Sequence, residues 1–255
     1  MIALIPAKGY SRRVPGKNKR EFCGLPLVAW SIIQAKCSRY VEKVFVSTDD
    51  DEIADITVEY GGNVLWRHYK QDPDDAGNVP TYYALLDLLE MYGDLLSKRF
   101  VNLFSTSPLR FPDGIDNVVE AALTHPVDSV TQTLCIMHEI LLYVRMEDDQ
   151  IAPVLGEKLG HYCLFGQATQ VNSVQRYLTT ERPMIEGGIA TDTSYNQGMR
   201  VLPSPQYYIS VPLWQSYECD TPEDWEICET LMEAFILKGR GPEVYYEYAR
   251  RQVVE

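Results

Sequence analysis

The first 134 residues alternate between short apolar runs and segments with helical spacing of apolar side chains, and this alternation limits the folds open to the chain. The apolar runs predict buried strands at 2–5, 43–47, 63–67, 100–104 and 129–134. The segments between them predict helices at 25–38, 49–60, 80–92 and 112–124. Strands and helices that alternate with short connections form a largely parallel sheet with helices on both faces. The sequence therefore predicts an α/β fold.

Residues that favour helix ends mark where the first two helices start and stop. Pro26 suits a first helical turn, because the N–H that proline lacks would have no partner there. Thr48 or Asp49 is predicted to cap the second helix with a side-chain oxygen that accepts a backbone N–H. Gly61 and Gly62 are predicted to stop that helix.

The second half of the chain has a weaker pattern. Two short runs on either side of a polar stretch predict an antiparallel hairpin at 143–145 and 151–155. We expect one domain spanning 1–255, with an insertion at about 136–190 and no clear period up to residue 213. The later segments are predicted to be a strand at 207–211, a helix at 222–238, and a tail at about 239–255 that packs on its own chain or on a partner.

Composition limits the classes of function. A chain of 255 residues that is 45% hydrophobic can bury a full core. Its formal net charge of −13 argues against nonspecific nucleic-acid binding, which needs a basic surface. Six scattered cysteines without a CxxC pair favour reduced thiols over disulfides or a zinc site. With no signal segment and no apolar run of membrane length, we expect a cytoplasmic, small-molecule protein that contacts neither nucleic acid nor membrane.

The loop after the first strand gathers positive charge in this acidic chain. It carries the four cations Lys8, Arg12, Arg13 and Lys17, with glycines and a serine between them. Open α/β sheets bind ligands beyond their strand ends, and glycines there let backbone N–H groups approach phosphate oxygens. The spacing matches neither GxGxxG nor a P-loop. The loop is predicted to hold a phosphate group, and a solvated surface cluster is the alternative.

Two acids near the end of the chain are spaced as a pair of metal ligands. On an extended stretch, Glu218 and Asp220 would point to one face while Cys219 points away. Mg²⁺ takes one or two protein carboxylates and keeps water and phosphate oxygens as its other ligands. Ordinary surface acids are the alternative. Asp224 is predicted instead to complete a capping box with Thr221 at the start of the last helix.

Five blocks of sequence, in this order, resemble the CMP-sugar synthetases, the acylneuraminate cytidylyltransferase family. They are IPAKGYSRRVPGKN, FCGLPLVAWSI, VFVSTDDDEIA, LFSTSPLR and ECDTPEDWEICE. LFSTSPLR is similar to the family's LQPTSPLR, and the last block to its acidic D-x-D-T-P-E-D segment. The blocks cover roughly the first half of the chain and one later segment.

The resemblance implies a Rossmann-like nucleotidyltransferase fold and a set of site residues. It implies Mg²⁺ as cofactor and a homodimer formed by a lobe that is exchanged between subunits, although an irregular, loop-rich insertion fits the sequence equally well. The implied roles are catalysis for Lys8, Arg12 and Lys17, nucleotide binding for Ala7, Gly9, Ser11, Asn18, Arg67 and Thr81, acceptor binding for Phe104, Thr106, Ser107 and Arg110, and metal binding for Glu218 and Asp220.

Several of these residues have ordinary structural alternatives. Asn18 fits a turn, and Arg67 fits an exposed arginine at a strand end. Thr81 fits an early helical position. Arg110 can hold a carboxylate or phosphonate with its planar fork, or can pair with one of many surface acids.

Four positions depart from the family pattern. Lys8 stands where many relatives have arginine, which keeps the charge and loses the two-pronged geometry. Tyr10 replaces a small residue, and Glu218 replaces the more usual aspartate. Phe104 replaces a glutamine, so a hydrogen bond from that amide to a polyhydroxylated sugar is lost.

Three functions follow from these observations as hypotheses. The first is Mg²⁺-dependent transfer of CMP from CTP to the hydroxyl of a nonulosonic acid, with release of pyrophosphate. The second keeps the nucleotide and changes the acceptor to a phosphonate, a phosphate or a 3-deoxy sugar acid. The third is a relative that binds CTP without turnover, which the departures at Lys8, Tyr10 and Phe104 motivate.

Overall fold

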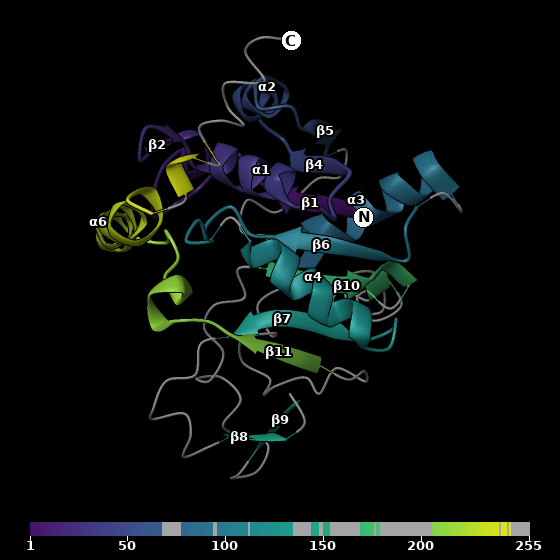
Figure 1. Cartoon of the computed structure of the whole chain (residues 1–255). Helices are drawn as coiled ribbons and strands as arrows, with labels where there is room; N and C mark the ends of the chain where they lie inside the picture. The colour runs from purple at the N-terminus through teal and green to yellow at the C-terminus, as the bar shows by residue number, and fades with distance from the viewer. Residues whose placement is uncertain are drawn as a thin grey trace.

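The computed structural model contains a central seven-stranded sheet with strand order β11-β7-β10-β6-β1-β4-β5 (Figure 1). The structure describes residues 1–67, 78–93, 96–111, 113–134, 144–147, 150–153, 169–175, 177–178, 206–239, 241–243 and 245. The sheet strands are β1 (Ile2–Pro6), β4 (Lys43–Thr48), β5 (Asn63–Trp66), β6 (Arg99–Leu103), β7 (Val130–Leu134), β10 (Thr169–Ser173) and β11 (Gln206–Ser210). The predicted α/β alternation is confirmed.

Most strand pairs in the sheet are parallel. β1 runs parallel to β4 and β6, β4 to β5, and β7 to β11. β10 is the exception, because it lies antiparallel between β6 and β7. The sequence did not predict this strand. Its residues Thr-Gln-Val-Asn-Ser contain one apolar side chain, so no run of apolar residues marked it.

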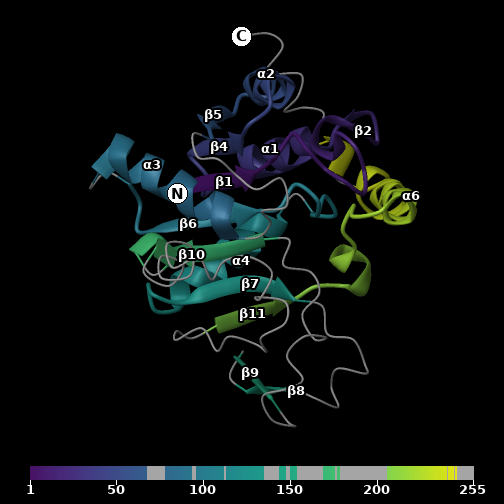
Figure 2. The same ribbon diagram turned by 180° about the vertical axis from the view of Figure 1, so that it is seen from behind.

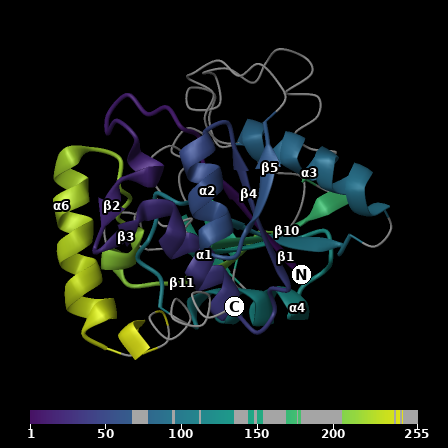
Figure 3. The ribbon, with the colours of Figure 1, turned by 90° about the horizontal axis from the view of Figure 1, so that it is seen from above.

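Helices cover both faces of the sheet. They are α1 (Leu27–Cys37), α2 (Asp51–Glu59), α3 (Asn78–Tyr92), α4 (Gly114–Thr124) and α6 (Pro222–Leu231), which a π-helical turn extends over Met232–Leu237. α1, α2 and α4 pack on one face against Ala3, Ile5 and Val101. α3 packs on the other face, against Leu4 and Phe100. Figure 3 shows α1 and α2 on one side of β1 and β4, and α3 on the other.

A second apolar cluster joins the last helix to the first. Trp30 of α1 packs with Trp225 of α6, Met232 and Tyr245. The ring of Tyr245 lies edge-on to Trp30 with centroids 5.8 Å apart, and its hydroxyl donates to the carbonyl of Arg110 at 3.0 Å. The tail therefore packs on its own chain at this residue, which is one of the two predicted arrangements.

Two predicted helix starts are wrong in detail. Asp50, and neither Thr48 nor Asp49, caps α2, since its Oδ1 accepts the N–H of Ile53 at 3.1 Å. Pro26 lies before α1, in the short strand β3 (Leu25–Pro26) that pairs with β2 (Glu21–Phe22). The predicted stop after α2 is confirmed, because Gly61 has φ 73°, which an L side chain rarely adopts.

The predicted hairpin is confirmed as β8 (Val144–Glu147) and β9 (Gln150–Pro153). Of the rest of the predicted insertion at 136–190, residues 169–175 and 177–178 are described, and they include β10, which lies within the sheet. The other residues of the insertion, and with them the exchanged lobe, lie outside the described residues. The described residues also form 3-10 turns at Lys17–Lys19 and Leu213–Ser216. Among the described helices, none is both long and apolar enough to cross a membrane.

Candidate active site

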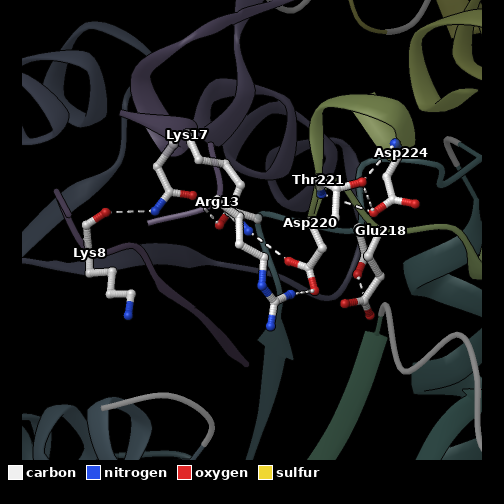
Figure 4. A network of polar contacts seen from close by, with 10 residues as sticks. Lys8, Arg13, Lys17, Glu218, Asp220, Thr221 and Asp224 are labelled. Carbon is white, nitrogen blue, oxygen red and sulfur yellow. Dashed lines mark hydrogen bonds and ion pairs between the residues drawn. The ribbon is translucent and has the colours of Figure 1, made fainter. Parts of the chain in front are cut away.

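Three segments that are distant in sequence meet beyond the carboxyl ends of β1 and β6. They are the loop at 7–18, the loop at 104–110, and the acidic segment at 218–220. The N–H of Cys219 donates to the carbonyl of Thr106 at 2.7 Å, which ties the acidic segment to the loop after β6. Figure 4 shows the cationic loop and the two acids facing each other.

Asp220 forms ion pairs with two cationic side chains of the first loop. Lys17 Nζ lies 2.8 Å from its Oδ1, and Arg13 Nη1 lies 3.2 Å from its Oδ2. The Lys17 side chain is 12% exposed, whereas that of Arg13 is 68% exposed. The sequence placed Arg13 in the cationic loop but gave it no role. Its position next to Arg12 was the signal that could have identified it.

Glu218 lies deeper than Asp220 and is held by Ser107. Ser107 Oγ donates to Glu218 Oε1 at 3.1 Å. Burial raises the pKa of the Glu218 carboxyl, and the nearby charge of Asp220 raises it further, while Ser107 and Lys17 oppose the shift. Ser107, which was predicted to bind the acceptor, therefore contacts a predicted metal ligand in this structure.

The acidic segment is a tight turn, so the condition of an extended stretch, from which the sequence argument paired the two acids, is not met. The N–H of Asp220 donates to the carbonyl of Glu218 at 2.8 Å, and Cys219 is fully buried in the cluster beside Trp225. The predicted capping box is confirmed, because Asp224 N donates to Thr221 Oγ1 at 3.2 Å and Thr221 N to Asp224 Oδ2 at 2.9 Å. The cap fixes the helix start directly after Asp220.

Asn18 joins the first loop to the loop after β6. Its Nδ2 donates to the carbonyl of Lys8 at 2.8 Å, and its Oδ1 accepts from Ser105 Oγ at 2.7 Å. Gly9 donates its N–H to Asp49 at 2.8 Å, and a Cβ at Gly9 would lie 2.5 Å from Asp50 Oδ2. The close approach of this loop to the end of β4 therefore requires glycine.

The remaining predicted nucleotide residues lie around the same edge of the sheet. Ala7 is buried and its N–H donates to Ser47 O at 2.9 Å, while Ser11 is half-buried. Arg67 Nη2 donates to the same carbonyl at 3.0 Å, which holds the guanidinium at the end of β4. Thr81 is fully buried in α3.

The other side chains of the opening loop and of the acceptor loop differ in exposure. Lys8 is half-buried, whereas Arg12 and Tyr10 are exposed. Phe104 and Thr106, which follow β6, are half-buried.

Arg110, which was predicted to bind the acceptor, is buried in this structure. Its side chain is 3% exposed, and Nη1 donates to Gln34 Oε1 at 2.8 Å and to Ser31 Oγ at 3.2 Å. Its other donors reach Thr169 Oγ1 and the carbonyl of Phe104. Burial lowers the pKa of the guanidinium to about 10. The planar fork thus joins α1 to β10 and the loop after β6.

Glu218 and Asp220 suit Mg²⁺ by their chemistry. Both offer hard oxygen atoms on the side of the cationic loop. Burial raises the pKa of Glu218 most and repulsion from Asp220 adds to the shift, and a divalent cation would relieve that repulsion. Within the described part of the chain, no group of three or more His, Cys, Asp or Glu side chains could hold a metal. A two-carboxylate site fits Mg²⁺ better than a metal that needs a full cage of protein ligands.

The fold and the facing charges define an α/β nucleotidyltransferase. A solved structure of CMP:2-keto-3-deoxy-manno-octonic acid synthetase complexed with CTP has the same fold, with a TM-score of 0.62, 16% identity, and coverage of 91% of this chain and 98% of that chain. A family model described as cytidylyltransferase matches residues 2–148. The chain belongs to this cytidylyltransferase family.

Several curated relatives match nearly the whole chain. A CMP-N,N'-diacetyllegionaminic acid synthase from Legionella pneumophila is 31% identical over 241 residues, which cover 91% of this chain and 96% of the relative. An 8-amino-3,8-dideoxy-manno-octulosonate cytidylyltransferase from Shewanella baltica is 26% identical over 244 residues, which cover 89% and 96%. The resemblance to the CMP-sugar synthetases is confirmed.

Proposed function

We propose that this protein transfers CMP from CTP to the hydroxyl of a nonulosonic acid, releases pyrophosphate, and depends on Mg²⁺. The observation that carries the proposal is the contact of Lys17 and Arg13 with Asp220, two hundred residues away in sequence. This contact brings the cationic loop and the acidic pair together, and binding of a metal–nucleotide complex needs both.

In the proposed reaction, the acceptor oxygen forms a bond to the α-phosphorus of CTP while the bond to pyrophosphate breaks. The acceptor hydroxyl gives up its proton to solvent water. Lys8, Arg12 and Lys17 hold the phosphates and neutralise the charge that develops on the leaving pyrophosphate. Lys17 and Arg13 exchange part of their contact with Asp220 for phosphate oxygens when the nucleotide binds.

Glu218 and Asp220 would hold Mg²⁺, which when bound supplies positive charge beside the phosphates. Ser107 orients the Glu218 carboxylate by donating a hydrogen bond to one of its oxygens. The capping box that begins directly after Asp220 fixes the backbone position of that second acid. These contacts pre-position the acids before the nucleotide arrives.

Asn18, Arg67 and Thr81 are proposed to bind the cytidine. The carbonyl of Ser47 holds the Arg67 guanidinium at the sheet edge, and hydrogen bonds from two loops hold Asn18. Both are therefore restrained in orientation. We also propose that the protein works in the cytoplasm as a homodimer, with the part of 136–190 that precedes β10 as the subunit contact.

A second acceptor class is favoured by one observation. Phe104 is a half-buried phenyl ring at a position where the family pattern has glutamine. A ring cannot donate to a sugar hydroxyl, so a 3-deoxy sugar acid, a phosphonate or a phosphate is the alternative acceptor. Binding of CTP without turnover is the remaining alternative.

Measurement of pyrophosphate release tests the proposal and separates these acceptors. The purified protein is incubated with CTP, Mg²⁺ and, in turn, N,N'-diacetyllegionaminic acid, N-acetylneuraminic acid, a 3-deoxy-octulosonic acid and a phosphonate. We expect turnover with a nonulosonic acid, its loss with EDTA and its return with added Mg²⁺. UTP and ATP serve as controls for the base.

Each other result has a definite meaning. Turnover with the phosphonate or the 3-deoxy acid alone would replace the proposed acceptor class by the second one. Turnover that survives EDTA would remove the metal from the proposal. Calorimetric binding of CTP without turnover on any acid would leave a nucleotide-binding protein.

A further inference from the structure

A row of uncharged polar side chains crosses four neighbouring strands of the sheet. Register places Tyr208 of β11 opposite Gln132 of β7, Gln132 opposite Gln170 of β10, and Gln170 opposite Asn102 of β6. Directly opposed residues on paired strands point to the same face of a sheet. Asn102, Gln132, Gln170 and Tyr208 are named here the amide row.

The amide row lies on the face opposite α1, α2 and α4. Val101 and Leu103, the neighbours of Asn102 on β6, pack in the core beneath those helices, so Asn102 points the other way. There it meets Thr81 of α3. In Figure 2, which views the sheet from behind, α4 lies beyond β10 and β7, and α3 lies to one side of them.

Hydrogen bonds connect members of the amide row, but one buried amide donor of the row has no hydrogen-bond partner among the described residues. Gln170 Nε2 donates to Gln132 Oε1 at 2.9 Å, and the Tyr208 hydroxyl hydrogen-bonds to Gln132. Thr81 Oγ1 donates to Asn102 Oδ1 at 3.5 Å. Asn102 is fully buried, and among the side chains that the structure describes, its Nδ2 alone is a buried polar atom with no hydrogen-bond partner.

A buried donor without a partner destabilises a fold, because the group has lost its water and gained nothing in return. Each such group in a native structure needs an explanation, and a bound molecule that accepts its hydrogen bond is one. Gln170 and Tyr208 are only half-buried, so the row is open toward its β10 and β11 end. The row contains no charged side chain, which suits hydroxyl and amide groups better than a carboxylate.

The row also lies next to the loop that carries the acceptor motif. Phe104 follows Asn102 by two residues, directly beyond the end of β6. If the strand direction continues, both side chains belong to the same face. The amide of Asn102, the preceding side chain on that face, would then supply the hydrogen bond that the phenyl ring of Phe104 cannot.

We propose that the amide row forms the bottom of the acceptor site, and that Asn102 sets specificity by donating from Nδ2 to an oxygen of the sugar acid's hydroxyl or acylamido groups. This inference rests on the proposed function. Asn102 is a specificity-determining residue in this view, and the phosphates of CTP do not reach it.

Steady-state kinetics of two variants test the inference. Asn102→Leu removes the unpaired donor, and Gln170→Leu removes the half-buried amide beside it. With the sugar acid that the wild type turns over best, we expect the KM for the acid to rise about three- to tenfold in each variant, as for loss of one uncharged hydrogen bond. The KM for CTP is expected to stay unchanged.

Thr131→Val is the matched control. Thr131 neighbours Gln132 on β7 and is equally buried, but it lies opposite Val171 and so faces the other side of the sheet. We expect both KM values of this variant to equal those of the wild type. Melting temperatures of all three variants separate a loss of binding from a loss of folded protein.

Three results would overturn the inference. If the wild type turns over and both variants have the same KM for the acceptor as the wild type, the amide row is only part of the protein interior. The proposed function would then stay intact. A rise in the KM for CTP would mean that Asn102 supports binding of the cytosine base, through its hydrogen bond with Thr81, and does not bind the acceptor. Absence of wild-type turnover on every acid would remove the proposed function and the inference together.

Discussion

At the scale of single residues, Lys17 and Lys19 offer a test of the phosphate site within one 3-10 turn. Lys17 contacts Asp220 at 2.8 Å, whereas Lys19 contacts Asp50 at 3.0 Å and Glu52 at 2.9 Å. Loss of one well-placed charge on a transition state costs about 2–4 kcal/mol of barrier. We expect Lys17→Ala to lower kcat at least a hundredfold by the pyrophosphate assay, and Lys19→Ala to lower it little. Similar kcat values for the two variants would contradict the role of Lys17.

Asp220 permits a second test at this scale, directed at the metal. Removal of its charge takes away one of two proposed metal ligands and also one partner of Lys17. We expect Asp220→Asn to need at least tenfold more Mg²⁺ for half-maximal activity, measured by titration of Mg²⁺ at saturating CTP. Glu223→Gln, two residues beyond Thr221 in the first turn of α6, is the control. An unchanged Mg²⁺ requirement in Asp220→Asn would exclude this carboxylate from the metal site.

At the scale of elements, the start of α6 determines where the acidic pair lies. Thr221 and Asp224 satisfy each other's backbone N–H groups directly after Asp220. Loss of such a cap costs about 0.5–2 kcal/mol of stability. We expect Thr221→Ala to lower the free energy of unfolding by that amount in urea titrations, whereas Thr230→Ala, an exposed change later in the same helix, should not. Equal effects of the two changes would show that the cap has no special weight.

The elements also show how far the sequence could be interpreted without coordinates. Apolar runs located β1, β4 and β6, because these strands are buried on both faces, and helical spacing of apolar residues located α6. The strand β10 was missed, since Gln170 and Asn172 put polar groups on the face that the amide row occupies. The burial of Arg110 was missed because its partners Ser31 and Gln34 come from α1, and such distant hydrogen bonds leave no periodic trace. That Lys17 and Asp220 lie near each other was expected from the cationic loop, the two late acids and the sequence blocks shared with the family, taken together.

At the scale of the whole molecule, the charge distribution predicts two opposite responses to salt. The chain has a formal net charge of −13, so screening by salt reduces its self-repulsion and should raise the melting temperature. The opening loop is locally cationic, and the same screening weakens its attraction for CTP. Between about 20 and 300 mM KCl, over which the Debye length falls several-fold, we expect the KM for CTP to rise while the melting temperature rises or stays level. The KM of Arg12→Ala, which lacks one exposed cation of the loop, should depend less on salt. A KM for CTP that falls or stays constant with salt would mean that the loop cations do not attract the nucleotide, and the facing of cationic loop and acidic pair would then serve only to hold the chain together.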